Sequence, residues 1–241
     1  MADERTIILH YHLFKNAGTS VDAILKKNFS DRWVTREFPA RGGNNTPLVE
    51  DWIRETPEAI AYSSHTMMGP IPQVEGVRVI SFMLLRDPIE RIKSAYRFER
   101  TQEAQTWGAR LAKQHDFEGY VRARLARPGD RQCRNFQTYR LASLVPGEGS
   151  ELERAKRALK ELTGVGRVEA FDEAMATLQE RFDSNDNTFS SQSIRANRSE
   201  KTMMSHSFSD GFSEQVKLEN QLDTLLLDAI RNKPKHIGAK S

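Results

Sequence analysis

The chain has 241 residues, of which 29% are charged and 38% hydrophobic, a balance that suits a globular protein with a full core. Its formal net charge of +3 fits an anionic ligand but is too small to indicate nucleic-acid binding. A single cysteine excludes an intrachain disulfide and a four-cysteine zinc site, and no apolar run is long enough to span a bilayer, so we expect a cytoplasmic protein without a membrane span.

The first quarter of the chain predicts two strands and one helix. Residues 6–13 form an apolar run rich in β-branched and aromatic side chains, which is typical of a buried strand. Apolar residues recur at helical spacing over 19–29, and residues 59–64 indicate a second, short strand. Residues 32–57 show no regular pattern, so we expect them to be irregular.

The middle of the chain predicts two more strands separated by helices. Residues 77–86 carry the strongest strand signal, and Asp87–Pro88 supplies an N-cap and a first-turn proline for a helix that reaches about residue 105. Residues 165–171 indicate the other strand. Further helices are predicted over 115–126, 134–144, 150–163 and 171–182.

The C-terminal part begins with a long polar stretch, 185–210, which we expect to be a lid over a ligand or else a surface loop. Residues 213–233 predict one amphipathic helix, whose buried face is marked by Val216, Leu222, Leu225, Leu226, Ala229 and Ile230. Strands that alternate with helices predict the α/β class. We expect a single three-layer, P-loop-like domain over 1–241, with a central, mainly parallel sheet flanked by helices.

The segment FKNAGTS, residues 14–20, follows the first strand and leads into the first helix. In open α/β sheets ligands bind beyond the carboxyl ends of the strands. The small residues Ala17, Gly18, Thr19 and Ser20 would let backbone N–H groups and a helix N-terminus point at an anion, beside the charge of Lys15. An ordinary turn between strand and helix is the alternative. A nucleotide-triphosphatase loop would instead place its lysine after the last glycine.

A second candidate anion site lies in LLRDPIERIKSAY, residues 84–96. Arg86 is expected at the tip of a strand and Ser94 about two turns into the helix that follows, so together they could hold a separate phosphate. The alternative is a capped helix with a solvated arginine. We expect Arg91 and Arg97 to lie on the solvated face of that helix.

The pair of motifs resembles the 5′-phosphosulfate loop and the 3′-phosphate motif of sulfotransferases that use 3′-phosphoadenosine 5′-phosphosulfate (PAPS). Within that family it is most similar to the carbohydrate branch, which includes heparan sulfate 2-O-sulfotransferases and bacterial relatives. That branch often has PKTGGTS where this chain has FKNAGTS, so Phe14, Asn16 and Ala17 depart from the pattern. Weaker similarities at 63–69, 134–142, 166–178, 197–201 and 219–230 extend the resemblance over nearly the whole chain.

The resemblance implies a transferase that moves a sulfuryl group from PAPS to a hydroxyl of a carbohydrate or other small acceptor, without a metal. It assigns His65 as the general base and Lys15 as the group that stabilises the departing phosphate. The implied donor-binding residues are Lys15, Asn16, Ala17, Gly18, Thr19, Ser20, Arg86 and Ser94, with Ser193, Ser199 and Lys201 in a late loop.

Some charged residues remain outside this assignment. His10 and His12 share one side of the first strand, and with no third ligand in view we expect packed strand residues and no metal site. The arginines of 122–140 are expected on a solvated helix face, with contact to an anionic acceptor as the alternative. Two other functions stay open: a P-loop-like nucleotide or small-molecule kinase, and a nucleotide-binding protein without catalytic activity.

Overall fold

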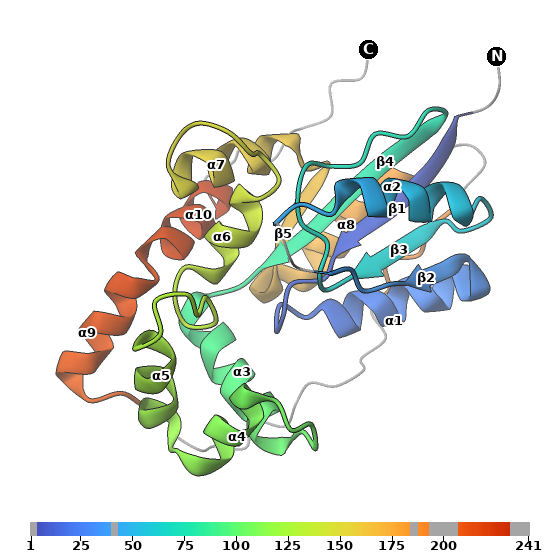
Figure 1. Ribbon diagram of the computed structural model, residues 1–241. Helices are drawn as coiled ribbons and strands as arrows, with labels where there is room; N and C mark the ends of the chain where they lie inside the picture. The colour runs from blue at the N-terminus through green and yellow to red at the C-terminus, as the bar shows by residue number, and fades with distance from the viewer. Residues whose placement is uncertain (1–3, 40–42, 184–187, 193–206, 232–241) are drawn as a thin grey trace.

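A computed structural model describes residues 4–39, 43–183, 188–192 and 207–231. Within these parts the chain forms one five-stranded sheet in the order β2-β3-β1-β4-β5, and every ladder is parallel. The strands are β1 (Arg5–Tyr11), β2 (Trp33–Thr35), β3 (Ala61–Ser64), β4 (Val77–Leu85) and β5 (Gly164–Arg167). This sheet, flanked by helices, confirms the predicted α/β class (Figure 1).

The helices connect these strands and continue beyond them. They are α1 (Gly18–Phe29), α2 (Thr46–Glu55), α3 (Pro88–Thr101), α4 (Trp107–Gln114), α5 (Phe117–Leu125), α6 (Phe136–Ala142), α7 (Glu151–Glu161), α8 (Phe171–Phe182), α9 (Asp210–Glu219) and α10 (Gln221–Arg231). Short 3-10 turns follow α1 and β5, at Ser30–Arg32 and Val168–Ala170. Within the described residues, no helix has the length and apolar character needed to cross a membrane.

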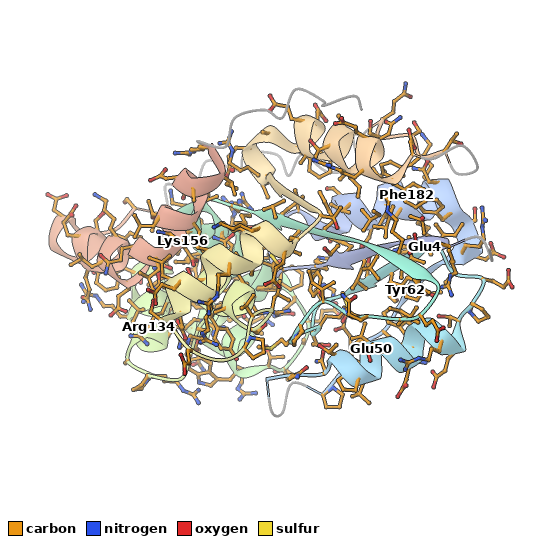
Figure 2. All side chains as sticks on the ribbon, turned by 90° about the horizontal axis from the view of Figure 1, so that it is seen from above. Glu4, Glu50, Tyr62, Arg134, Lys156 and Phe182 are labelled. Carbon is orange, nitrogen blue, oxygen red and sulfur yellow. The ribbon has the colours of Figure 1, made fainter. Side chains whose placement is uncertain are left out.

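Both faces of the sheet are covered, which explains why its central strands are apolar on both sides. Leu9 of β1 belongs to a buried cluster with α2, α6, α7 and α10. The next residue back, Ile8, points to the opposite face and packs with α1 and α8. Figure 2 shows this layering, with Phe182 on α8 and Glu50 on α2 on opposite sides of Tyr62 in β3.

A third buried cluster lies outside the two faces of the sheet. It joins α3, α4, α5 and α9, with Ile92, Tyr120 and Val216 among its fully buried members. Figure 1 shows these helices grouped beyond the point where β4 leads into α3. Since β4 ends there, this cluster stands beside the carboxyl edge of the sheet, where the candidate site was expected.

The prediction that residues 32–57 are irregular is wrong. They contain strand β2, which pairs with β3, and helix α2. Proline in the first turn of α2 is compatible with a helix start, and Val49, Trp52 and Ile53 form its buried stripe. α2 is only a few turns long, so its helical periodicity is short. The glycines and asparagines directly before it are typical of a loop, and they made the whole segment look irregular.

The single helix predicted over 213–233 is also wrong. The chain forms α9 and α10 with a break at Asn220, whose side chain donates to the carbonyls of Val216 and Cys133, both at 2.9 Å. The break changes which residues face inward. Leu225, expected in the buried face, is 46% exposed, whereas Asp223 is fully buried.

Candidate functional site

The loop between β1 and α1 has an unusual backbone for its sequence. Lys15 and Ala17 have φ of 65° and 58°, in the left-handed region that side chains other than glycine rarely adopt. Asn16 between them is buried, and its amide donates to the carbonyl of Leu84 at 2.7 Å and to the side chain of Gln137 at 2.8 Å. These contacts with β4 and α6 fix the shape of the loop.

The helix that follows the loop presents a bare N-terminus. Ala17 is the N-cap of α1, and among the described residues this end has no side-chain cap and no acidic residue in its first turn. The first N–H groups of a helix lack partners within it and carry the positive end of its dipole. Thr19 is exposed and Ser20 partly exposed. The hydroxyl groups and the helix end together suit an anion, and anion binding at this loop stays a prediction.

The two candidate motifs meet at this rim of the sheet. Arg86, directly after β4, donates from Nη1 to the carbonyl oxygen of Lys15 at 3.1 Å. Ser94 lies partly buried on α3, the helix that begins just after Arg86. The structure therefore brings Lys15 and Arg86 into direct contact, and one ligand could reach both residues.

Positive charge accumulates at the rim. Burial lowers the pKa of Lys15, and the nearby guanidinium groups of Arg86 and Arg97 lower it further. Burial also lowers the pKa of Arg86, against the opposing effect of Glu90 and Glu169. Arg97 is exposed, as predicted for a solvated residue, yet it acts on both of the other cations. A lysine whose pKa is lowered by neighbouring cations is expected where an anion binds.

The ammonium of Lys15 rests against an aromatic surface. Its Nζ lies 4.4 Å from the ring centre of Phe98, and Phe14 meets Phe98 edge to face with centroids 5.6 Å apart. Phe98 is 41% exposed, so this pair forms an apolar patch beside the lysine. Phe14 stands where the resembled motif has proline, and the aromatic contact is what this departure provides here.

His65 lies at the same edge, immediately after β3. Its Nδ1 is 2.7 Å from Glu37 Oε1, and its ring centroid is 3.8 Å from that of His12 on β1. A Cβ atom built on Gly18 would overlap the imidazole of His12. His12 therefore touches both the N-terminus of α1 and His65, and it links the predicted base to the predicted anion loop.

His10 and His12 are buried, as predicted, but the expectation of no third group beside them is wrong. Asp22 of α1 lies between them, with one oxygen 2.9 Å from His10 Nδ1 and the other 2.9 Å from His12 Nδ1. Burial raises the pKa of Asp22, but the hydrogen bonds from both histidines outweigh it and leave the pKa far below its usual range. These are hydrogen-bond distances to an ionised acceptor, so each Nδ1 carries a proton.

The sequence did not predict the hydrogen bonds by which Gln137 and Asp223 support the loop after β1. The Gln137 amide exchanges two hydrogen bonds with the backbone of Arg86, both at 2.8 Å, and also holds Asn16. Asp223 of α10 accepts from the backbone of Gln137 at 3.1 Å and of Thr138 at 2.7 Å. The glutamine and threonine lie in the segment 134–142 noted for its weak resemblance, which was the available signal.

The expectation of a solvated Arg91 is wrong. Its side chain is fully buried, donates to the carbonyl of Gln132 and lies 4.5 Å from the ring centre of Phe136. Burial lowers its pKa. Arg124 is likewise buried and paired with Glu99 at 2.7 Å, rather than on a solvated helix face. Both arginines hold the helical cluster together and are not available to an acceptor.

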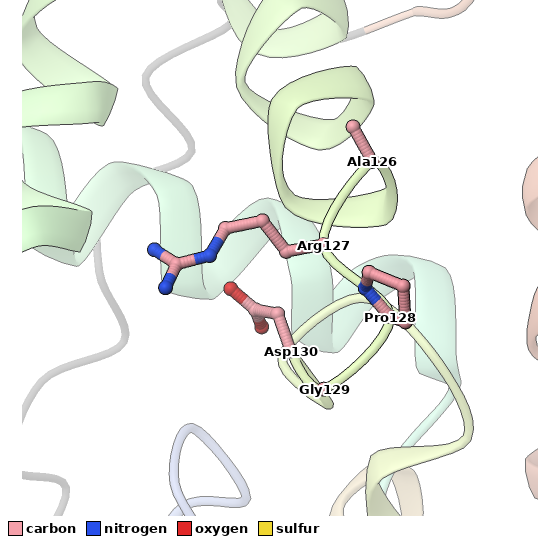
Figure 3. A pocket seen from close by; sticks show the side chains of 5 residues that line it. All are labelled: Ala126, Arg127, Pro128, Gly129 and Asp130. Carbon is pink, nitrogen blue, oxygen red and sulfur yellow. The ribbon is translucent and has the colours of Figure 1, made fainter.

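An open hollow on the turn after α5 is lined by Ala126–Asp130 (Figure 3). The guanidinium of Arg127 lies 4.3 Å from the ring centre of Trp107, and Asp130 pairs with Arg124 at 2.8 Å. Since both of its charged side chains already have partners, we place the candidate site at the loop after β1 and not in this hollow. Ser193, Ser199 and Lys201, predicted for the late loop, lie outside the described residues.

Comparisons with known proteins identify the family of the chain. A family model described as "Sulfotransferase family" matches residues 1–232. A relative from Archaeoglobus fulgidus, described as "Uncharacterized protein", is 41% identical over 184 residues, which cover 73% of each chain. A sulfotransferase structure from Alicyclobacillus acidocaldarius aligns with a TM-score of 0.43 and 15% identity, covering 94% of this chain and 95% of that one.

Proposed function

Because the chain belongs to the sulfotransferase family, we propose that it transfers a sulfuryl group from PAPS to a hydroxyl of a carbohydrate or other small acceptor. The observation that carries the proposal is the contact between Lys15 and Arg86 beside the uncapped end of α1. It supports an anion site that extends over two separate positions, as a donor with a phosphosulfate and a second phosphate requires. We further propose a cytoplasmic location and the carbohydrate branch of the family.

The donor would supply the activated sulfuryl group. In the proposal, the backbone N–H groups of residues 17–19, the hydroxyl groups of Thr19 and Ser20 and the ammonium of Lys15 bind the phosphosulfate, while Arg86 and Ser94 bind the 3′-phosphate. Ala17 would contribute its backbone N–H. Asn16 would act indirectly, because its backbone N–H donates to the Leu13 carbonyl and its side chain holds the loop against Leu84 and Gln137. Donors held rigidly where charge develops need no rearrangement during the reaction.

His65 would accept the proton of the acceptor hydroxyl. A bond then forms between the acceptor oxygen and sulfur, the bond from sulfur to the 5′-phosphate oxygen breaks, and the departing phosphate keeps the electron pair beside Lys15. Histidine suits this step near neutral pH. The position of the two residues supports this role, because His65 follows β3 and Lys15 follows β1, its neighbour in the sheet.

Thermal denaturation with two ligands tests the proposal. Adenosine 3′,5′-bisphosphate at about 100 times its Kd should stabilise the protein by about 2.7 kcal/mol, a rise in Tm of roughly 5–10 °C for a chain of this size. ATP with magnesium should give a much smaller shift. The reverse order would favour a nucleotide or small-molecule kinase, and stabilisation without any transfer of labelled sulfate to a panel of alcohols and glycans would indicate a binding protein.

Arg86→Ala locates the second phosphate. The variant should lose more affinity for adenosine 3′,5′-bisphosphate than for adenosine 5′-monophosphate, because only the bisphosphate carries the group that Arg86 would bind. Arg78→Ala is a suitable control, since Arg78 lies at the opposite end of β4. Equal losses for the two nucleotides would remove Arg86 from the 3′-phosphate site.

A further inference from the structure

We propose that Glu37 is a positioning residue that holds His65 in the Nδ1–H tautomer and leaves Nε2 free to accept a proton. The inference deepens the proposed function and rests on it for the role of His65. Glu37 lies outside every sequence motif considered above, in a segment expected to be irregular. The proposal follows from the contacts that converge on its carboxylate.

The carboxylate of Glu37 accepts several hydrogen bonds from the segment that carries His65. Its oxygens lie 3.2 Å from the backbone nitrogen of His65, 2.7 Å from its Nδ1 and 2.8 Å from Thr66 Oγ1. Ser64 Oγ lies at 3.3 Å. A carboxylate with this many donors around it has little freedom to turn away from His65.

The charge state of Glu37 decides the tautomer. Burial raises the pKa of Glu37, but hydrogen bonds from His65 and Thr66 outweigh it and leave the pKa below its usual range. An ionised carboxylate can only accept a hydrogen bond, so His65 Nδ1 must be the donor. In a neutral imidazole the other nitrogen, Nε2, then carries the lone pair. This is the form that a general base requires.

The imidazole of His65 also packs against the ring of His12. The imidazole of His12, bonded to Asp22 and packed against Gly18, lies 3.8 Å from that of His65 between ring centres. The His65 side chain is 51% exposed, so solvent alone would leave it mobile. A carboxylate at Nδ1 and a buried ring against one face together restrict it to a narrow range of orientations.

If Glu37 had a purely structural role, its removal would lower the stability of the protein without changing the tautomer of His65. Contacts between half-exposed polar side chains contribute little to stability, roughly 0–1 kcal/mol even when both groups are charged, and both Glu37 and His65 are about half exposed. Removing the carboxylate should therefore leave the Tm almost unchanged. The effect expected from a positioning residue lies in the imidazole itself.

The test combines ¹⁵N-histidine NMR of the ligand-free protein with sulfuryl transfer from PAPS. His65 signals are assigned by their loss in His65→Ala. At a pH where the ring is neutral, we expect the wild type to show the Nδ1–H tautomer. Glu37→Gln should retain only part of it, because the glutamine amide can either accept from Nδ1 or donate to it. Glu37→Ala should move His65 toward the Nε2–H form. Glu55→Ala is the matched control, a half-exposed glutamate paired with Arg36.

Transfer rates give the second readout. We expect kcat to fall about 10-fold in Glu37→Gln and about 10²-fold in Glu37→Ala, within the range that general base catalysis contributes. An Nε2–H tautomer in the wild type, or no change of tautomer in Glu37→Ala, would overturn the inference. So would a change of tautomer without loss of kcat. The NMR measurement needs no acceptor, so it decides the tautomer of His65 whether or not sulfuryl transfer is found. A failure to find transfer would count against the proposed function and not against the tautomer.

Discussion

At the scale of single residues, the loop after β1 shows what the sequence did and did not reveal. The sequence predicted a loop between a strand and a helix that contains Lys15, Gly18, Thr19 and Ser20. The structure has this loop between β1 and α1, at one rim of the sheet. The left-handed backbone of Ala17 was not predictable, because alanine pays about 1–2 kcal/mol for it and is a poor indicator of such a turn. The contacts of Asn16 with Leu84 and Gln137 hold the conformation, and they depend on residues far away in sequence.

Gly18→Ala tests how closely the helix end is packed. A methyl group at this position would overlap the imidazole of His12, which cannot move away because Asp22 holds it. We expect a loss of about 1–3 kcal/mol in the free energy of unfolding, measured by urea denaturation. Gly129→Ala is the control, since a Cβ there meets nothing within 4 Å. Equal stability of the two variants would contradict the packing described.

His65→Ala separates binding from chemistry. If His65 is the general base, the variant should keep the affinity of the wild type for adenosine 3′,5′-bisphosphate and lose about 10²–10⁴-fold in kcat. Isothermal titration and transfer from labelled PAPS measure the two quantities. Unchanged turnover would exclude the histidine from the mechanism.

At the scale of elements, long periodic segments were predictable and short ones were not. The strands β1 and β4 and the helices α1 and α8 carry enough regular residues to be recognised. β2 and α2 were missed, since three strand residues and a short helix hardly differ from a loop in pattern. The break at Asn220 was missed because a single asparagine is a weak local signal for a helix end, and one of its two side-chain bonds is to Cys133, which is far away in sequence.

Asp223 shows the result of that break. It accepts from the backbone of Gln137 and from the backbone and hydroxyl of Thr138, and is fully buried. Asp223→Ala would leave these donors without a partner, so we expect a loss of about 3–5 kcal/mol in the free energy of unfolding. Asp228→Ala, on the same helix but half exposed, should cost less than about 1 kcal/mol. Denaturant titration of both variants provides the comparison.

At the scale of the whole molecule, the sequence indicated the class of fold but not the order of the strands. Alternating strands and helices were enough to predict a parallel sheet. The order places β1 between β3 and β4, and this is what brings His65, Lys15 and Arg86, one after each strand, to a single edge. Strand order depends on contacts across the entire chain, so no local pattern contains it.

The net charge of +3 favours the approach of an anionic nucleotide to the protein. The cations at the rim attract a polyanion from solution, and salt screens that attraction over about 10 Å at 0.1 M and about 3 Å at 1 M. We expect the Kd for adenosine 3′,5′-bisphosphate to rise several-fold across this range, more than the Kd for adenosine. Titration calorimetry at increasing potassium chloride concentrations measures the dependence. A Kd that does not change with salt would argue against an electrostatic site.

The single amide of Gln137 has a consequence for how the protein acquires activity. It joins the turn after β1 to the tip of β4, the longest strand described, and its own helix is anchored by the carboxylate of Asp223 on α10. The turn therefore has its final support only after the chain has been synthesised past Asp223. We expect a product that stops before residue 220 to retain every proposed catalytic group and still be inactive, because it lacks α10.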